Sequence, residues 1–201
     1  NRLRSALHGL LLSNGTRGLI FDLSMGLFSF LNTDRQNFDV SASDSRLSVD
    51  LTKFIIGSTP LGKEPWDGDS FAKHLEKEVT LKSEQYGYEL GVKKGKLDYA
   101  FFAVKDFKGT FLVKDKSLLL SSTTDREEII SIFGEPYWTD FDDSEIILFY
   151  EFQESATELQ FEFPDGEPLG FITLMKGGVL SKQDQRESYG VTKPWPPEKR
   201  Q

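Results

Sequence analysis

An internal similarity between residues 46–104 and 118–174 constrains this chain more than any other feature. Each stretch contains a short apolar strand, a capped helix and further strands joined by turns. "YELGVKKGKLDYAFF" aligns with "LQFEFPDGEPLGFIT", and Gly95 then falls beneath Gly166. This similarity predicts two copies of one unit, although short α+β segments also look alike by chance.

The second copy contains the clearer local signals. "TTDREEIISIFG" predicts a helix with Thr123 or Thr124 as the N-cap and Glu127 within reach of a capping box. Gly134, as C-cap, ends this helix before Pro136. Three strands are predicted after it, "EIILFYEF", "TELQFEF" and "GFITLM", with a hairpin turn at "PDGEPL" between the last two.

The first copy follows the same order. "RLSVDLTKFIIG" predicts a strand, and "DGDSFAKHLEKE" predicts a helix capped by Asp69 or Ser70. "YGYELGV" and "LDYAFFAV" are predicted strands joined by the turn "KKGK". Near the start of the chain, leucines at helical spacing predict an amphipathic helix: Leu3, Leu7, Leu10 and Leu11.

These patterns predict an α+β protein made of two related helix-plus-antiparallel-sheet units in one layered structure. Strands that follow one another through short turns favour antiparallel pairing, and the absence of a G-x-G-x-x-G or P-loop sequence argues against a doubly wound nucleotide-binding fold. The predicted divisions are an N-terminal helix and strand segment, two units and a Pro-rich tail: 1–45, 46–110, 111–180 and 181–201.

The capped helix ending in "FGEP", followed by a polar loop and three strands, resembles the tandem units of beta-lactamase-inhibitor-protein-like domains. The residues that support the resemblance are "TTDREEIISIFGEP" and the following "LFYEF", "LQFEF" and "GFITL". The first copy matches in outline. Similar single units occur in small outer-membrane assembly lipoproteins, but this chain has no lipobox cysteine. The resemblance implies protein binding through a concave sheet face, as in inhibitors and bacterial immunity proteins.

Composition excludes several kinds of partner and site. A net charge of −8 makes nucleic acid a poor partner and favours a basic protein. The chain has no cysteine, which excludes disulfides and thiolate zinc sites but leaves the compartment open. We expect no cofactor and no transmembrane helix, and we favour the cytoplasm slightly over the periplasm as the location.

The acidic stretch "FGEPYWTDFDDSEIILFYEF" raises the question of a metal or catalytic site. Asp140 and Asp142 alternate, but no glycine follows them, and Glu151 would close a calcium loop from within a strand. We therefore predict a solvated loop without metal. Glu158 and Glu162 lie on the strand face away from the core, where a carboxylate pair is more often exposed than catalytic. We predict no catalytic residue, and the two histidines, His8 and His74, are expected to be ordinary helix residues.

Aromatic residues beside acids are typical of protein-binding hot spots. We therefore predict a partner-binding surface formed by Tyr137, Trp138, Asp140, Asp142, Asp143 and Trp66. Trp138 is equally consistent with a core position. Phe141 and Phe149 are predicted to belong to the core.

Pro194, Pro196 and Pro197 exclude a helix from the last residues and favour an extended tail. Trp195 is expected to fold back onto the chain's own domain, and docking into a partner is the alternative. The function predicted from these features is a non-enzymatic protein-interaction module of inhibitor or immunity type. A hydrolase that uses paired carboxylates and a structural domain of the cell envelope remain as alternatives, and the oligomeric state is open.

Overall fold

The computed structural model describes residues 35–37, 47–69, 71–72, 78–142, 144–165 and 168–195. The chain divides into two units, Asn1–Thr33 and Asp34–Gln201, and all described residues belong to the second. The predicted N-terminal helix, His8 and His74 lie outside the described residues, as does most of the helix predicted in the first copy. None of the helices in the described part is long and apolar enough to cross a membrane.

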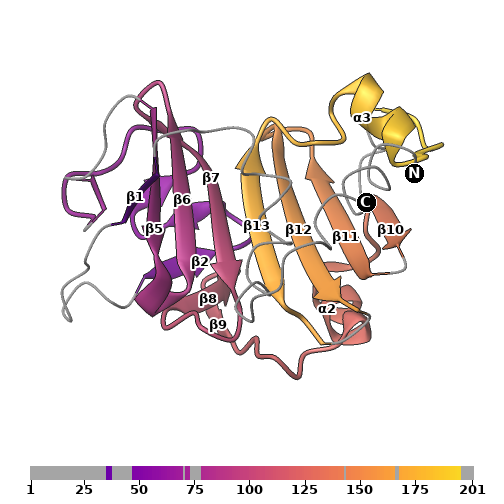
Figure 1. The fold of residues 1–201 in the computed structure, drawn as a ribbon, viewed down its shortest axis with the longest axis horizontal. Helices are drawn as coiled ribbons and strands as arrows, with labels where there is room; N and C mark the ends of the chain where they lie inside the picture. Colours follow the sequence, from indigo (N-terminus) through magenta and orange to yellow (C-terminus); the bar gives the residue numbers. More distant parts are fainter. Residues whose placement is uncertain are drawn as a thin grey trace, which may run out of the picture. The chain divides into compact units, whose positions relative to one another are not determined.

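An eight-stranded sheet dominates the second unit (Figure 1). Its strands, in spatial order, are β1 (Arg35–Asn37), β5 (Glu78–Ser83), β6 (Tyr88–Lys93), β7 (Lys96–Ala103), β13 (Phe171–Lys176), β12 (Thr157–Pro164), β11 (Glu145–Phe152) and β10 (Trp138–Asp142). Neighbouring strands are antiparallel except for β1, which runs parallel to β5. The pairing of β7 with β13 joins the two predicted units into one continuous sheet.

A second sheet has five short strands, and the sequence did not indicate it. In spatial order they are β4 (Thr59–Pro60), β3 (Ile55–Ile56), β2 (Ser48–Asp50), β8 (Thr110–Val113) and β9 (Lys116–Leu118). The single strand predicted over 46–57 is therefore two strands, β2 and β3, separated by a turn in which Phe54 has a φ of 57°. The Asp50 carboxylate holds this turn by accepting hydrogen bonds from the backbone N–H groups of Thr52 and Lys53, both at 2.9 Å.

The main core lies on one face of the large sheet. Alternate residues of its strands point to this face, for example Leu90 on β6 and Phe102 on β7. The small sheet contributes Val49 and Phe111 to the same cluster, and the Phe102 and Phe111 rings meet edge to face at 5.6 Å. The small sheet therefore buries this face over one half of the large sheet.

Helix α2 (Arg126–Phe133) covers the same face over the other half of the sheet. Ile129 is fully buried, and the Phe133 ring lies 4.9 Å from the ring of Phe161 on β12. Asp125 is the N-cap, because its carboxylate accepts the backbone N–H of Glu128 at 2.8 Å. A 3-10 helix, η4 (Glu84–Tyr86), connects β5 to β6, and α3 (Gln183–Ser188) follows β13.

The opposite face of the large sheet holds a second, smaller cluster. Its buried members are Tyr137, Ile147, Phe149 and Leu180. Residues 179–195, here called the C-terminal segment, supply most of the partly buried members of this cluster, which are Trp138, Val179, Tyr189, Val191 and Trp195. The Trp195 ring meets the Tyr137 ring at 5.8 Å, which confirms that this tryptophan packs back onto its own domain.

The predicted fold class is wrong. The molecule is mostly β, with two sheets and two α-helices in the described residues, and it is not a pair of helix-plus-sheet repeats. Residues 48–60 pair with 110–118 to build a separate sheet, whereas the second copy has no comparable strands. Similar local patterns produced different structures because these short strands pair with residues far away in the chain. The local patterns contain no information about such partners.

Several local predictions are confirmed. Strand β11 covers 145–152 as predicted, and β12 and β13 differ from prediction by one residue at their ends. Helix α2 ends at Gly134, whose φ is 78° and whose N–H bonds to the carbonyl of Ile130. The "KKGK" turn forms, with positive φ at Lys94 and Gly95. The predicted N-caps Thr123 and Thr124 are one or two positions early, because Asp125 occupies the cap.

Candidate functional site

Two places in the second unit are candidate sites. The first is the edge strand β10, whose alternation places Trp138 and Asp140 on one face and Phe141 on the other. The Phe141 side chain is 66% exposed, although the sequence pattern assigned it to the core. It pairs across the ladder with Ile146, which is only partly buried at this end of the core. The sequence interpretation of Phe141 is therefore corrected.

Charged residues from the start of α2 lie beside Phe141. The Arg126 guanidinium lies over the Phe141 ring, with its carbon 5.9 Å from the ring centroid. Arg126 also forms an ion pair with Glu127 at 2.8 Å. We call Phe141, Arg126 and Glu127 the β10 surface. It combines one large exposed aromatic with both signs of charge.

Tyr137 and Trp138 pack against their own domain and are not exposed aromatic anchors of the kind predicted for a partner-binding surface. Tyr137 is 6% exposed, and its hydroxyl donates to the backbone carbonyls of Lys193 and Pro194 at 3.4 and 3.2 Å. Trp138 is half-buried against the smaller cluster. Its indole Nε1 is buried without a hydrogen-bond partner among the described residues.

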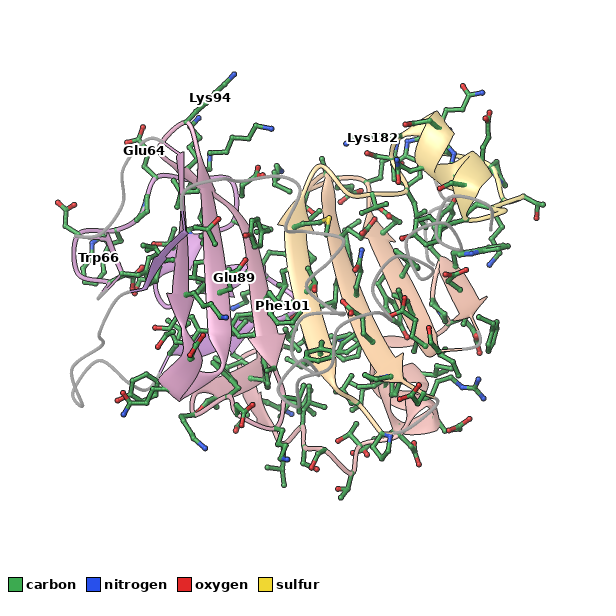
Figure 2. All side chains as sticks on the ribbon, viewed as in Figure 1. Glu64, Trp66, Glu89, Lys94, Phe101 and Lys182 are labelled. Atoms are coloured by element: carbon green, nitrogen blue, oxygen red, sulfur yellow. The ribbon has the colours of Figure 1, made fainter. Side chains whose placement is uncertain are left out.

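Trp66 is 60% exposed but does not join the β10 surface. It follows β4, and the adjoining Gly62 and Lys63 form backbone hydrogen bonds with Leu97 of β7. Three strands, β13, β12 and β11, lie between β7 and β10. Figure 2 shows Trp66 projecting from the loop beyond the small sheet. The carboxylate of Asp69 holds that loop by accepting the backbone N–H of Ser58 at 2.9 Å. Asp143 and the side chain of Asp142 lie outside the described residues.

The second candidate site begins with a row of buried polar side chains on the face of the large sheet away from the main core. They come from β5, β6, β13 and β12: Thr80, Glu89, Thr173, Glu162, Gln160 and Glu158. Figure 2 shows Glu89 on β6, beside Phe101 on β7. The sequence placed Glu158 and Glu162 on this face correctly but expected them to be exposed, whereas they are 0% and 5% exposed.

Glu151 and Glu158 face each other across β11 and β12. Burial raises the pKa of Glu151 well above its ordinary value, and the hydrogen-bonded carboxyl of Glu158 raises it further through like-charge repulsion. The pair therefore keeps a proton at neutral pH. Leu180 of the C-terminal segment donates its N–H to Glu158 Oε2 at 3.1 Å, and Gln160 Nε2 donates to Oε1.

Two further glutamates complete the row. Burial and the nearby charge of Glu145 raise the pKa of Glu162 to about 7, while Thr173 donates a hydrogen bond to its Oε1 at 3.2 Å. Glu89 Oε1 accepts the Tyr99 hydroxyl at 2.6 Å, and its Oε2 is buried without a partner among the described residues. The sequence pattern gave no signal for the burial of these groups, because it depends on segments remote in the chain.

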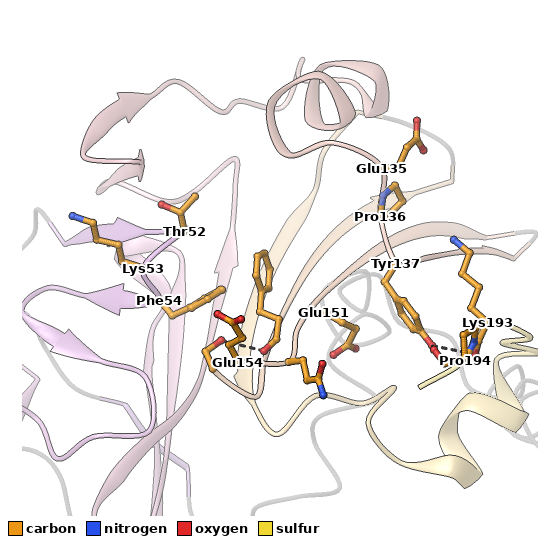
Figure 3. Close-up of a pocket in the computed structure, with 13 residues that line it drawn as sticks. Thr52, Lys53, Phe54, Glu135, Pro136, Tyr137, Glu151, Glu154, Lys193 and Pro194 are labelled. Carbon is orange, nitrogen blue, oxygen red and sulfur yellow. Dashed lines mark hydrogen bonds between the residues drawn. The ribbon is translucent and has the colours of Figure 1, made fainter. Parts of the chain in front are cut away.

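A pocket of about 860 Å³ opens at the end of β11, and Glu151 contributes to its wall (Figure 3). The turn between β2 and β3 supplies Lys53 and Phe54, and the C-terminal segment supplies Lys193 and Pro194. The remaining lining residues are Thr52, Glu135, Pro136, Tyr137, Phe152, Gln153, Glu154 and Ser155. The pocket therefore has aromatic and proline walls with charged groups around them.

The distances between the buried carboxyl groups can be compared with those that glycoside hydrolysis requires. Glu158 and Glu162 are four residues apart on one strand, a separation of about 13 Å, whereas glycosidases place their carboxyl groups about 5–10 Å apart. Glu151 and Glu158 share a hydrogen bond and are closer than that range. Among the described residues, no group of three or more His, Cys, Asp or Glu side chains is placed to hold a metal ion.

No family model, curated protein or solved structure matches this chain. The resemblance to beta-lactamase-inhibitor-protein-like domains therefore remains a prediction.

Proposed function

We propose that this protein is an interaction module that binds a protein partner through the β10 surface. The observation that carries the proposal is the exposure of Phe141, which is 66% exposed on a sheet edge. Aromatic side chains supply much of the binding energy at interfaces when a partner desolvates them. The inhibitor or immunity role predicted from the sequence is the narrower form of this proposal.

Strand β10 offers a partner its backbone as well as its side chains. In the described part of the sheet β10 pairs only with β11, and we propose that a partner adds a strand at its other edge. Two features restrict what docks there: the strand is five residues long, and the Arg126 guanidinium lies over the Phe141 ring. We therefore expect a partner that pairs with this short edge through its backbone and covers the Phe141 ring with a side chain.

Charge favours a basic partner. The net charge is −8, and Asp140, Glu127 and Glu128 lie on β10 and the first turn of α2. Long-range attraction from such a surface raises association rates and weakens with salt. Asp142 and Asp143, from the predicted site, belong to the same stretch of chain and are expected to contribute to this attraction.

Site-specific photo-crosslinking tests the proposal. We expect p-benzoylphenylalanine at position 141 to give one defined adduct in lysate of the source organism, and the yield to fall as salt is raised. With the captured partner purified, Phe141→Ala should weaken binding by about 2 kcal/mol or more. Circular dichroism would check that the variant remains folded.

The matched control places the same photo-reactive residue at position 66, because Trp66 is the other large exposed aromatic among the described residues and is 60% exposed. An adduct at 141 and none at 66 supports the β10 surface. The same adduct at 66 alone would assign binding to the Trp66 loop, and full-strength binding by Phe141→Ala would also reject the proposal.

A further inference from the structure

The pocket at the end of β11 contains an unsatisfied buried acceptor. Glu151 is 8% exposed, and its Oε1 has no hydrogen-bond partner among the described residues. Figure 3 shows Glu151 between the Phe54 side of the pocket and the Tyr137 side. Buried polar atoms without partners are rare in folded proteins, so an unpaired acceptor in a pocket wall points to a ligand that donates hydrogen bonds.

The charges around the pocket restrict which ligand can donate hydrogen bonds to Glu151. Lys53 forms an ion pair with Asp115. Arg186 acts on Glu151 through space, but its guanidinium donates to the carbonyls of Leu180 and Ser181 at 2.9 and 3.0 Å.

Lys193 remains as a lining cation, against Glu135 and the single negative charge shared by Glu151 and Glu158. Acids therefore outweigh bases in the lining, which favours a ligand that carries positive charge.

The walls suit a cation on an apolar stem. The Phe54 and Phe152 rings meet edge to face at 4.9 Å on one side, and Tyr137 and Pro194 form the other. Such surfaces pack against methylene groups and attract cations through the ring faces. The Tyr137 hydroxyl holds the Lys193–Pro194 backbone at this wall by two long hydrogen bonds, at 3.4 and 3.2 Å.

We propose that this pocket binds an alkylguanidinium group, with its N–H donors bonded to Glu151 Oε1 and its stem between Phe54 and Tyr137. A guanidinium spreads its charge over several planar N–H donors and is weakly hydrated, whereas an ammonium is a compact, strongly hydrated point charge that loses more hydration in an apolar-walled pocket. Binding moves one proton from the Glu151–Glu158 pair to solvent, because the ligand's charge favours the doubly ionised pair. The site is independent of protein binding at the β10 surface.

Calorimetric titration with agmatine at pH 7.5 tests the proposal. We expect saturable binding, with a heat that depends on the ionisation enthalpy of the buffer because a proton is released. N-carbamoylputrescine replaces the guanidinium with a neutral urea group of the same shape, and it should bind at least ten-fold more weakly. Equal binding of the two ligands, or no binding of agmatine, would overturn the proposal.

Matched variants locate the site. Glu151→Gln keeps the side-chain shape and should weaken agmatine binding at least ten-fold and abolish proton release. Glu162→Gln removes a buried carboxyl from the same sheet face but outside the pocket, and should leave binding within two-fold. If Glu151→Gln binds as tightly as the unchanged protein, or if cadaverine binds more tightly than agmatine, the guanidinium assignment fails.

A second titration distinguishes the two sources of this group. N-acetyl-arginine amide carries the guanidinium as a protein side chain would, and N-acetyl-citrulline amide is its neutral control. Tighter binding of the arginine amide than of agmatine would identify the site as a receptor for a partner's arginine. The reverse order would identify it as a site for a small metabolite, and either order supports the guanidinium site itself.

Discussion

At the scale of single residues, Glu162 is an ionisable group whose burial has a direct thermodynamic consequence. Its pKa is about 7 in the folded protein, against an ordinary value of 4.5. Below pH 4.5 both the folded and the unfolded chain hold the proton. Between pH 4.5 and 7 the unfolded chain releases a proton that the folded chain keeps, so stability falls as the pH rises through this window.

We therefore predict that Glu162→Gln stabilises the protein above pH 7, by up to about 3 kcal/mol, because the amide has no charge to bury. The amide oxygen can still accept the hydroxyl of Thr173. Urea unfolding at pH 4 and pH 8 measures the difference. The gain should vanish at pH 4, and an equal gain at both values would mean that the carboxyl is not the cause.

At the scale of elements, the β6–β7 hairpin is shaped by one close contact. Gly91 pairs with Tyr99 across the ladder, and the register shifts between Gly91 and Val92. A Cβ at position 91 would overlap the Tyr99 ring, which crosses the glycine on its way to Glu89. The close approach of the Tyr99 ring therefore requires a glycine at this position. The backbone conformation does not require one, because the φ of Gly91 is not in the left-handed region.

Replacing Gly91 by Ala should lower the free energy of unfolding by about 1–3 kcal/mol, because the Tyr99 ring must move and its hydrogen bond to Glu89 is strained or lost. Chemical denaturation monitored by tyrosine and tryptophan fluorescence would measure this.

The matched control for this change is Gly95→Asn in the adjoining turn. Gly95 has a φ of 73° and open space around it, and asparagine tolerates that conformation. Gly95→Asn should therefore cost less than Gly91→Ala. If the order of the two costs is reversed, backbone conformation and not ring contact governs this hairpin.

At the scale of the whole second unit, the C-terminal segment covers part of the sheet face opposite the small sheet and α2, over β10, β11 and β12. It contributes Leu180, Tyr189 and Trp195 to the smaller cluster. The Tyr189 ring meets Phe149 at 5.3 Å, and the Arg186 guanidinium carbon lies 5.7 Å from the Trp195 ring centroid. The short helix α3 (Gln183–Ser188) lies within this segment, just before the Pro-rich residues for which the sequence predicted an extended conformation.

We predict that Trp195→Ala lowers the free energy of unfolding by about 1–3 kcal/mol, less than the loss for a fully buried tryptophan because Trp195 is half-buried. Trp66→Ala makes the same chemical change at a residue that is 60% exposed, and should cost less than about 1 kcal/mol. Thermal and urea unfolding of both variants would compare them. Equal losses would show that the C-terminal segment does not stabilise this face.

Several local elements of this protein were determined by the sequence alone. Alternation and β-branched residues specified β11, β12 and β13, and Gly134 specified the end of α2, because these signals depend on neighbours within a few residues. The return of Trp195 to its own domain was also predictable, since a tryptophan among prolines gains free energy by burying its ring.

The tertiary structure decided which strands pair and which polar groups are buried. The five-stranded sheet joins residues some sixty positions apart in the chain, such as Val49 with Phe111, and no local pattern specifies such a partner. Phe141 is exposed because β10 is an edge strand, and Glu158 is buried because Leu180 covers it. Exposure and pKa depend on what remote segments place over a residue, so the candidate pocket at Glu151 became visible only in three dimensions.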